Sequence, residues 1–200
     1  MKKLAIIGAS GHGKVIADIA KKNGYTDIVF LDDNENVREC GGYSVIGKSS
    51  EAGHLDADLI IGIGNAEVRK RIQESVPKER LATLIHPAAV VAEDVVLGAG
   101  TVIMAGAVIN SGARIGNGCI INTCSSVDHD CILGDYVHIA VGSHLCGTII
   151  VGSQTWIGAG ATVSNNLSIC PGCMIGAGAV IVKNIDIAGT YTGIPAKRIR

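Results

Sequence analysis

The stretch VLGAGTVIMAGAVINSGARIG, from Val96 to Gly116, places an aliphatic residue at every sixth position. The same spacing continues in both directions, from Ile85 to Ile187, without an insertion and with only Ile, Leu or Val at these positions. A hexapeptide period with frequent glycine is typical of a parallel β-helix, in which three hexads form one coil of roughly 18 residues. Each hexad turns its aliphatic side chain inward, so we predict a solenoid from Ile85 to Asp186.

Glycine often follows the inward aliphatic residue. It does so at Gly98, Gly116, Gly134, Gly152, Gly158 and Gly176. Because glycine adopts backbone conformations that other residues avoid, we expect these positions to let the chain turn the corners of each coil.

The residues before the repeat follow a different pattern, in which strands alternate with helices. We expect strands at 3–10, 27–33 and 56–65, and helices at 13–24 and 66–76. Buried strands that alternate with helices predict a small parallel sheet of the doubly wound kind. The sequence therefore predicts an α/β, Rossmann-like domain over residues 1–84 and a β-helix with a C-terminal tail over residues 85–200.

Composition excludes several classes of protein. The net charge is −1 and no basic stripe is present, which argues against nucleic-acid binding. The apolar runs are too short for membrane insertion, and the opening MKKLAIIG is too short for a secretory signal. The seven cysteines include one CxxC pair, Cys170 and Cys173, which raises the possibility of a redox or zinc half-site. The repeat accounts for both as small buried residues, so we expect a reduced, cytoplasmic protein.

Three ionisable residues, Asp128, His129 and Asp130, interrupt an otherwise apolar part of the repeat. His129 lies two residues after the inward Val127, so we expect it at a corner and facing outward. A neutral imidazole can take a proton near pH 7, and a neighbouring carboxylate can orient the ring and stabilise its charged form. Asp128 also has a plainer interpretation, as a turn residue that bonds the backbone.

A glycine-rich turn, GASGHG, joins the first strand to the first helix. Its spacing is GxxGxG, not the dinucleotide pattern GxGxxG, so it gives little support for a nicotinamide cofactor. The free N–H groups at a helix N-terminus nevertheless suit an anion such as a diphosphate. The acidic pair Asp32 and Asp33, and the GIGN segment at 62–65, end later strands at the same sheet edge, where ligands collect.

The whole chain resembles the bacterial hexapeptide-repeat sugar acetyltransferases that act on UDP-4-amino sugars of the bacillosamine type, together with relatives named as sialic acid O-acetyltransferases. The resemblance rests on IIGASGHGKV, on His86–Pro87, on the VDHD hexad and on GIPAKRI at 193–199. It implies a left-handed β-helix, a homotrimer, and transfer of acetyl from acetyl-CoA to the amine of a UDP-4-amino-4,6-dideoxy sugar. O-acetylation of sialic acid or of another sugar hydroxyl stays open as an alternative.

The resemblance also implies roles for individual residues. His129 would be the general base, Asp130 would raise its basicity although relatives often carry Glu there, and Asn122 would position the amine or the base. Acetyl-CoA would contact His138, Gly147, Ala159 and Ala177. The nucleotide sugar would contact Ser10, Gly11, His12, Gly13, Asp32, Asp33 and Gly64. No metal is implied.

Two other functions remain possible at this point. The γ-type carbonic anhydrases use this fold to hold zinc with three histidines between subunits, and the candidates here are His129, His138 and His144. The full hexad between His138 and His144 puts them on adjacent faces, which argues against a metal site. His129 and His138 should lie on opposite sides of one triangular coil and so meet only between chains. A non-catalytic scaffold with a nucleotide-sensing head is the second alternative.

Overall fold

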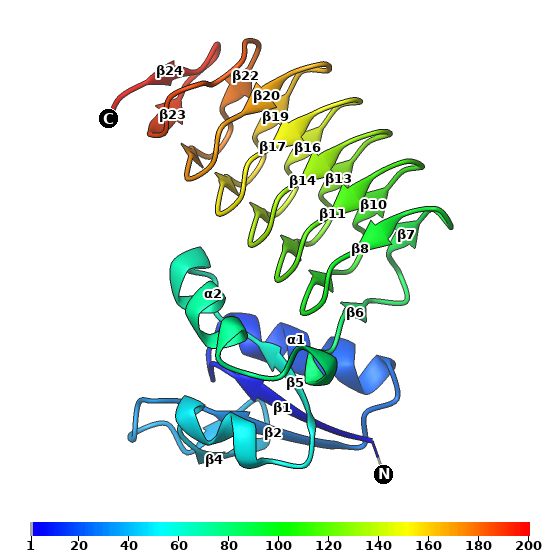
Figure 1. Cartoon of the computed structure of the whole chain (residues 1–200), viewed down its shortest axis with the longest axis vertical. Coiled ribbons are helices and arrows are strands. Elements are labelled where there is room, and N and C mark those ends of the chain that lie inside the picture. The colour runs from blue at the N-terminus through cyan, green and yellow to red at the C-terminus, as the bar shows by residue number, and fades with distance from the viewer. Residues whose placement is uncertain (1) are drawn as a thin grey trace.

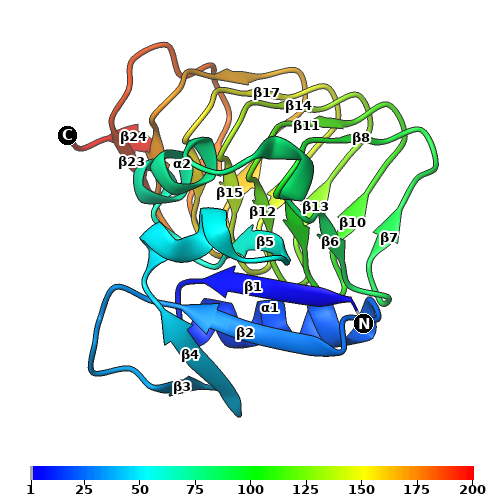
Figure 2. The same ribbon diagram turned by 60° about the horizontal axis from the view of Figure 1, so that its bottom comes forward.

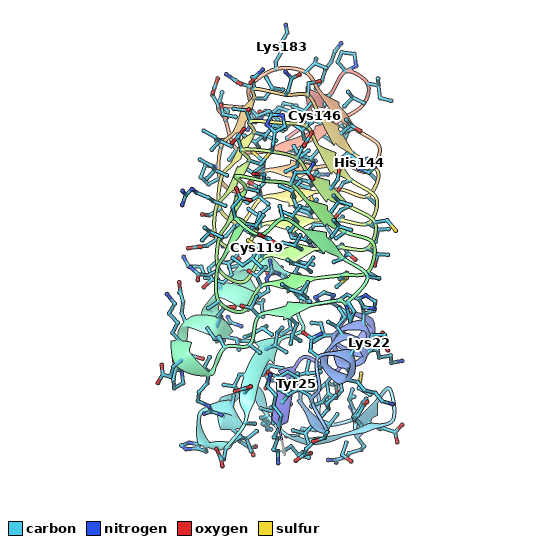
Figure 3. All side chains as sticks on the ribbon, turned by 90° about the vertical axis from the view of Figure 1, so that its right-hand side faces the viewer. Lys22, Tyr25, Cys119, His144, Cys146 and Lys183 are labelled. Carbon is cyan, nitrogen blue, oxygen red and sulfur yellow. The ribbon has the colours of Figure 1, made fainter. Side chains whose placement is uncertain are left out.

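The computed structural model describes residues 2–200 and contains an α/β head and a long solenoid (Figure 1). The N-terminus lies in the head and the C-terminus at the far end of the solenoid. Seen from the side, the solenoid stands on the head, with Tyr25 near one end of the molecule and Lys183 at the other (Figure 3). No helix within residues 2–200 combines the length and the apolar character needed to cross a membrane.

The head contains one sheet with the strand order β3-β4-β2-β1-β5. Its strands are β1 (Lys3–Ile7), β2 (Asp27–Leu31), β3 (Glu39–Cys40), β4 (Tyr43–Gly47) and β5 (Asp58–Ile61). Its helices are α1 (Gly11–Lys22), α2 (Ala66–Glu74) and the 3₁₀ helices η1 (Ser49–His54) and η2 (Lys78–Arg80). The three predicted strands are parallel neighbours, as expected for the Rossmann-like class. Sequence analysis did not identify β3 and β4, which extend the sheet beyond β2.

The solenoid is a left-handed parallel β-helix whose two-residue strands stack into three faces. Face 1 contains β6 (Leu84–Ile85), β9 (Val102–Ile103), β12 (Ile120–Ile121), β15 (His138–Ile139), β18 (Trp156–Ile157) and β21 (Met174–Ile175). Face 2 contains β7 (Val90–Val91), β10 (Val108–Ile109), β13 (Ser126–Val127), β16 (His144–Leu145), β19 (Thr162–Val163) and β22 (Val180–Ile181). Face 3 contains β8 (Val96–Leu97), β11 (Arg114–Ile115), β14 (Ile132–Leu133), β17 (Ile150–Val151) and β20 (Ser168–Ile169). The strands β23 (Thr190–Thr192) and β24 (Lys197–Arg198) extend face 1, and the expected domain boundary at 84/85 falls within β6.

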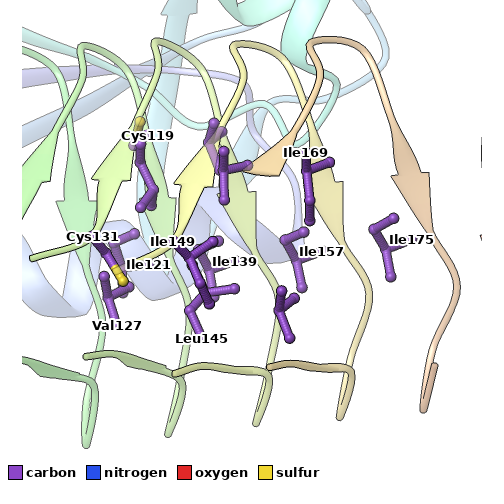
Figure 4. Packing of buried hydrophobic residues seen from close by; sticks show 14 of the residues in the cluster. Cys119, Ile121, Val127, Cys131, Ile139, Leu145, Ile149, Ile157, Ile169 and Ile175 are labelled. Carbon is purple, nitrogen blue, oxygen red and sulfur yellow. The ribbon is translucent and has the colours of Figure 1, made fainter. Parts of the chain in front are cut away.

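The second residue of each solenoid strand points into the coil, which confirms the hexapeptide register. Ile121, Ile139 and Ile157 stack on successive strands of face 1 and are fully buried (Figure 4). The period fails at its last position, because Ile187 is 62% exposed. Ile185 takes its place, at 5% exposure and paired with Ile169, so the final coil is two residues shorter than predicted.

Glycines do turn the chain at many corners, but the glycines that directly follow the inward residues are not the ones that do so. A Cβ on Gly98 would lie 2.4 Å from Asn117 N in the next coil, which shows that this glycine permits close stacking of coils. The turns are made two residues later, at a position with positive φ. Gly100, Gly106 and Gly112 occupy it, but so do Cys124 and Asp130.

Face 1 receives the head. The outward residues Leu84, Val102 and Ile120 are buried in one apolar cluster with Ile16 and Ile19 of α1. Figure 2 shows α1 and β1 lying beneath this face, with α2 beside its edge. The next outward positions on face 1 are His138 and Trp156, which lie beyond this apolar cluster.

Candidate active site

His129 and Asp130 form a pair at the turn between β13 and β14. The His129 Nδ1 lies 2.8 Å from Asp130 Oδ2, and the two side chains are 57% and 65% exposed. Asp128 Oδ1 accepts from His129 N at 2.8 Å and from Asn110 Nδ2 at 2.7 Å. Its carboxylate therefore bonds the backbone, which confirms the plainer interpretation of Asp128.

The local backbone sets the geometry of the pair. Asp130 has a φ of 58°, at the turn position that carries positive φ in neighbouring coils, and aspartate is among the residues that tolerate this region. An ionised carboxylate can only accept hydrogen bonds, so His129 donates its Nδ1–H to Asp130 and presents the Nε2 lone pair. This hydrogen bond raises the pKa of His129 above its usual value.

Glycines of the adjacent coils flank the pair. A Cβ on Gly147 would lie 2.3 Å from His129 Nε2 and 2.5 Å from Cε1. A Cβ on Gly112, in the preceding coil, would lie 2.5 Å from Asp130 Oδ1. The structure thus brings the predicted residues His129, Asp130 and Gly147 together, and the His129 ring occupies space that a side chain at 147 would fill.

His138 and Asn122 form a second group, on and beside face 1. Asn122 Nδ2 lies 3.1 Å from His138 Nε2, while Asn122 Oδ1 accepts from Thr123 N at 2.8 Å. Asn122 is therefore the donor, and the proton on His138 belongs to Nδ1. This buried Nδ1 has no hydrogen-bond partner within residues 2–200.

The surroundings of His138 keep its ring neutral. Its ring lies 4.3 Å from the Trp156 ring and 6.5 Å from the His12 ring, measured between centroids. Burial lowers the pKa of His138 to about 3, with the Arg69 charge as the next cause. Burial and Arg69 likewise lower the pKa of His12 to about 4. His138 is therefore suited to donate a hydrogen bond from Nδ1, and unsuited to take a proton near neutral pH.

The predicted site residues of the solenoid thus fall into two groups within one chain. His129 and Gly147 lie at the turns from face 2 to face 3, whereas His138 lies on face 1 with Asn122 beside it. The exposed Ala159 and Ala177 follow β18 and β21, at the turns from face 1 to face 2. His144 projects from face 2, where its Nδ1 lies 2.9 Å from Ser126 Oγ. Within residues 2–200 no three His, Cys, Asp or Glu side chains gather closely enough to hold a metal ion.

A cavity of about 430 Å³ lies in the head, at the carboxyl ends of β1, β2 and β5. Its lining includes Gly8, Asp32, Asp33, Ser49, Ile63 and Arg71. Asp32 Oδ2 accepts from Ala9 N at 2.7 Å, so this carboxylate stabilises the glycine-rich turn. Asp33 accepts from Ser49 N and Oγ, both at 2.9 Å, and the bond from the Ser49 hydroxyl is the main cause of its lowered pKa. Sequence analysis missed Ser49 and Arg71, since neither belongs to a recognisable motif.

The glycine-rich turn leads into α1 as predicted. Ser10 is the N-cap residue, and neither a side-chain cap nor an acidic residue occupies the first turn that begins at Gly11. A Cβ on Gly13 would lie 2.3 Å from Gly8 O, so glycine is needed there for packing. His12 is not among the residues that line the head cavity, and its ring lies 6.5 Å from the ring of His138, a proximity that sequence analysis did not predict.

A second cavity, of about 480 Å³, lies between the start of α2 and face 1. Gly64 lines it together with His138, Gln154, Trp156 and Met174. Gly64 is therefore separated from Asp32 and Asp33, which line the head cavity. The only clue to Trp156 in the sequence was that it is the single tryptophan, placed at an outward strand position.

The cysteines offer no nucleophile arrangement beside His129. Cys131 is fully buried, whereas Cys124 is exposed at a turn with a φ of 54°. The Cys170 and Cys173 sulfurs lie 3.5 Å apart as free thiols, with Cys173 buried and Cys170 partly exposed.

The fold and the site together define a hexapeptide-repeat protein with an α/β head and a histidine–aspartate pair at a solenoid turn. Residues 3–76 match the family described as PglD N-terminal domain. The chain is 38% identical over 111 residues to UDP-N-acetylbacillosamine N-acetyltransferase of Bacillus subtilis (strain 168), which covers 52% of this chain and about half (51%) of that relative's length. It is 29% identical to GDP-perosamine N-acetyltransferase of Escherichia coli O157:H7, over 76% of this chain and 73% of the relative.

Solved structures match over nearly the whole chain. The acetyltransferase domain of PglB from Neisseria gonorrhoeae FA1090, in complex with acetyl coenzyme A, is 40% identical, covers 99% of each chain and has a TM-score of 0.95. A mutant of perosamine N-acetyltransferase from Caulobacter crescentus, in complex with CoA and GDP-perosamine, is 32% identical over 100% of this chain and 98% of that chain, with a TM-score of 0.95. The chain belongs to this family of PglD-like acetyltransferases.

Proposed function

We propose that this protein transfers the acetyl group of acetyl-CoA to the amine of a UDP-4-amino-4,6-dideoxy sugar, for bacterial glycan biosynthesis. The observation that carries the proposal is the His129–Asp130 pair at an exposed turn. The Nε2 atom of His129 lies beside Gly147 of the next coil. An acetyl donor is named for the PglB domain, and nucleotide-linked amino sugars are named for the curated relatives.

The chemistry follows from the tautomer of His129. Acetyl-CoA supplies an activated acetyl group as a thioester. As the amine attacks the thioester carbonyl, His129 Nε2 takes the amine proton, and Asp130 stabilises the resulting imidazolium through the 2.8 Å bond to Nδ1. The C–S bond then breaks, so the acetyl group stays on the sugar nitrogen and the thiolate of CoA leaves and takes up a proton. The exposed small residues Ala159 and Ala177 leave room for an extended ligand along the coils, and the buried Nδ1–H of His138 can donate to it.

We place the nucleotide in the head. The start of α1, with its uncapped N–H groups, suits the diphosphate, and Asp32 holds the preceding turn in shape through Ala9 N. The base and ribose fit the cavity of about 430 Å³ that Asp33 and Arg71 line. Gly64 lies between this cavity and face 1, on the path of the sugar.

A complete site needs a second copy of the chain, and we propose a homotrimer. In one chain the base His129 and the donor group His138 lie on different faces, so a shared site requires solenoids packed side by side. Outward aliphatic residues on face 3 support such packing, because Val96, Ile132 and Ile150 are 52%, 45% and 52% exposed. With seven free cysteines, we expect the assembly to work in the cytoplasm.

Release of CoA tests the activity. The protein is incubated with acetyl-CoA and one of four acceptors: a UDP-4-amino-4,6-dideoxy sugar, GDP-perosamine, CMP-sialic acid or free sialic acid. Because Cys124 is exposed, the thiol signal of the protein without acceptor is subtracted. Rapid CoA release with the UDP-amino sugar alone supports the proposal. Release with GDP-perosamine alone would change the nucleotide, release with sialic acid alone would favour O-acetylation, and acetyl-CoA failing to bind would favour a nucleotide-sensing scaffold.

A further inference from the structure

Arg69 is a buried cation at the junction of the head and the solenoid. It lies on α2, is 1% exposed, and its guanidinium donates only to backbone carbonyls within residues 2–200. Burying a guanidinium costs several kcal/mol, and the cost is offset only when its donors are satisfied. An apolar residue could hold the head against the solenoid without this desolvation cost, so Arg69 is expected to do more than hold the two halves together.

The four carbonyls come from both halves of the molecule. Nε donates to Gly118 O at 2.7 Å and Nη2 donates to Tyr136 O at 2.8 Å. Gly118 and Tyr136 occupy the positive-φ turn position of successive coils. Nη1 donates to Ile63 O and Gly64 O, both at 2.8 Å, in the segment that follows β5. One planar group thus fixes the 62–65 segment of the head to two turns of the solenoid.

The 62–65 segment is the wall between the two cavities. Ile63 lines the head cavity, and Gly64 lines the cavity on face 1 that also contains His138. The segment packs tightly against the glycine-rich turn, since a Cβ on Gly62 would lie 3.2 Å from Gly8 O. Any shift of this wall would therefore change the distance between a nucleotide in the head and the reacting end of its sugar on face 1.

Gln73 provides a natural comparison. It lies one turn further along α2, is 4% exposed, and donates Nε2 to Ala99 O of the solenoid at 3.0 Å. Like Arg69, it joins α2 to the turns that lead from face 3 to face 1. Within residues 2–200, no hydrogen bond connects it to Ile63 or Gly64. Gln73 therefore only joins α2 to the solenoid, whereas Arg69 joins α2 to the solenoid and also binds the 62–65 segment.

We propose that Arg69 is a positioning residue for acetyl transfer: by holding Ile63 and Gly64 against the turns at Gly118 and Tyr136, it sets the acceptor sugar at the correct distance from face 1. This inference rests on the proposed function. Arg69 is buried and lines neither of the two cavities, so its removal should separate binding from turnover. A displacement of about 1 Å in an active site can cost roughly 10²-fold in rate.

The experiment compares Arg69→Met, Arg69→Lys and the control Gln73→Met in the full chain. For Arg69→Met we expect kcat to fall about 10²-fold while the dissociation constants of UDP and CoA, measured by calorimetry, change less than about threefold. Arg69→Lys should recover part of the rate, and Gln73→Met should keep a rate near that of the wild type. An unchanged rate in Arg69→Met, a loss equal to that of Gln73→Met, or a parallel loss of UDP and CoA binding would overturn the proposal.

Hydrogen exchange of the peptide that contains residues 62–65 supplies a readout independent of turnover. Arg69→Met should speed its exchange at least tenfold, whereas Gln73→Met should not. If the wild type showed no turnover with any acceptor, the proposed function would fail, and this second measurement would still decide whether Arg69 positions the wall. Unchanged exchange in Arg69→Met would refute the positioning role.

Discussion

Gly147→Ala offers a sharp test of the catalytic geometry, because the three atoms nearest to the added methyl group all belong to the ring of His129. The new Cβ would lie 2.3 Å from His129 Nε2, 2.5 Å from Cε1 and 3.0 Å from Cδ2. Non-bonded atoms settle at about 3.5 Å or more, so the ring must move by roughly 1 Å. Such a displacement is expected to lower kcat about 10²-fold.

Stability should hardly change in this variant. Gly147 has no positive φ, and the group that must yield is the end of a side chain that is 57% exposed. We therefore expect a change within about 0.5 kcal/mol in the free energy of unfolding, as for ordinary surface substitutions. Gly53→Ala is the neutral control, because nothing lies within 4 Å of its Cβ. Gly98→Ala is the opposite control, because its Cβ would strike backbone at 2.4 Å and should destabilise the solenoid.

Steady-state kinetics, calorimetry with CoA and urea unfolding measure the turnover, the CoA affinity and the stability of Gly147→Ala. We expect a lower kcat with unchanged CoA affinity and an unchanged unfolding midpoint. Full activity in Gly147→Ala would refute the placement of the His129 ring. Weaker CoA binding with an intact kcat would show that Gly147 serves the acetyl donor instead of the base.

Four further outcomes follow from the same structure. His129→Ala should lower kcat by about 10²–10⁴-fold with an unchanged circular dichroism spectrum, and a normal rate would remove His129 from the mechanism. Asp130→Asn should lower the pKa of His129, because the carboxylate raises it, so the acidic limb of the kcat/KM profile should move to lower pH while the plateau falls; an unmoved limb would contradict this. Asp32→Ala should weaken UDP binding through loss of the bond to Ala9 N and leave CoA affinity unchanged, as calorimetry can check, and an equal loss of both would argue against a separate head site. His12 and His138 have pKa values of about 4 and 3 in the folded state and 6.5 in the unfolded state, so protonation favours the unfolded state and their contribution to stability is lost as pH falls from 6.5 toward 3. The urea midpoint of the double variant His12→Asn/His138→Asn should therefore fall less steeply over this pH range than that of the wild type. Parallel curves for the two proteins would refute the assignment.

The solenoid could be predicted from sequence because its constraint is local and repeated. Each two-residue strand turns its second side chain into the coil, so Ile121, Ile139 and Ile157 meet the same requirement on three successive strands of face 1. The outward corner position of His129 follows from the same count. The register failed only at Ile187, where no further coil follows to require the period, and Ile185 closes the interior instead.

Contacts between the two halves could not be predicted, because no period relates them. The pairing of His12 with His138 depends on how α1 docks on face 1. Arg69 sits in a helix with many charged residues, where an exposed position would be the ordinary expectation. Its burial depends on backbone carbonyls that accept its hydrogen bonds, two of them from Gly118 and Tyr136 in the solenoid, and the sequence of α2 carries no sign of these partners.

The geometry of the catalytic pair arises from the turn of the solenoid itself. Four successive coils have a residue with positive φ at this corner, namely Gly112, Asp130, Thr148 and Asn166. The Asp130 side chain is one that tolerates this conformation. Gly112, eighteen residues earlier, leaves space for the Asp130 carboxylate, and Gly147, eighteen residues after His129, leaves space for the imidazole. The short Asp130 side chain reaches His129 Nδ1 at 2.8 Å. The stacking rule that builds the coil therefore also places an acid beside a base, with a glycine on either side to make room for them.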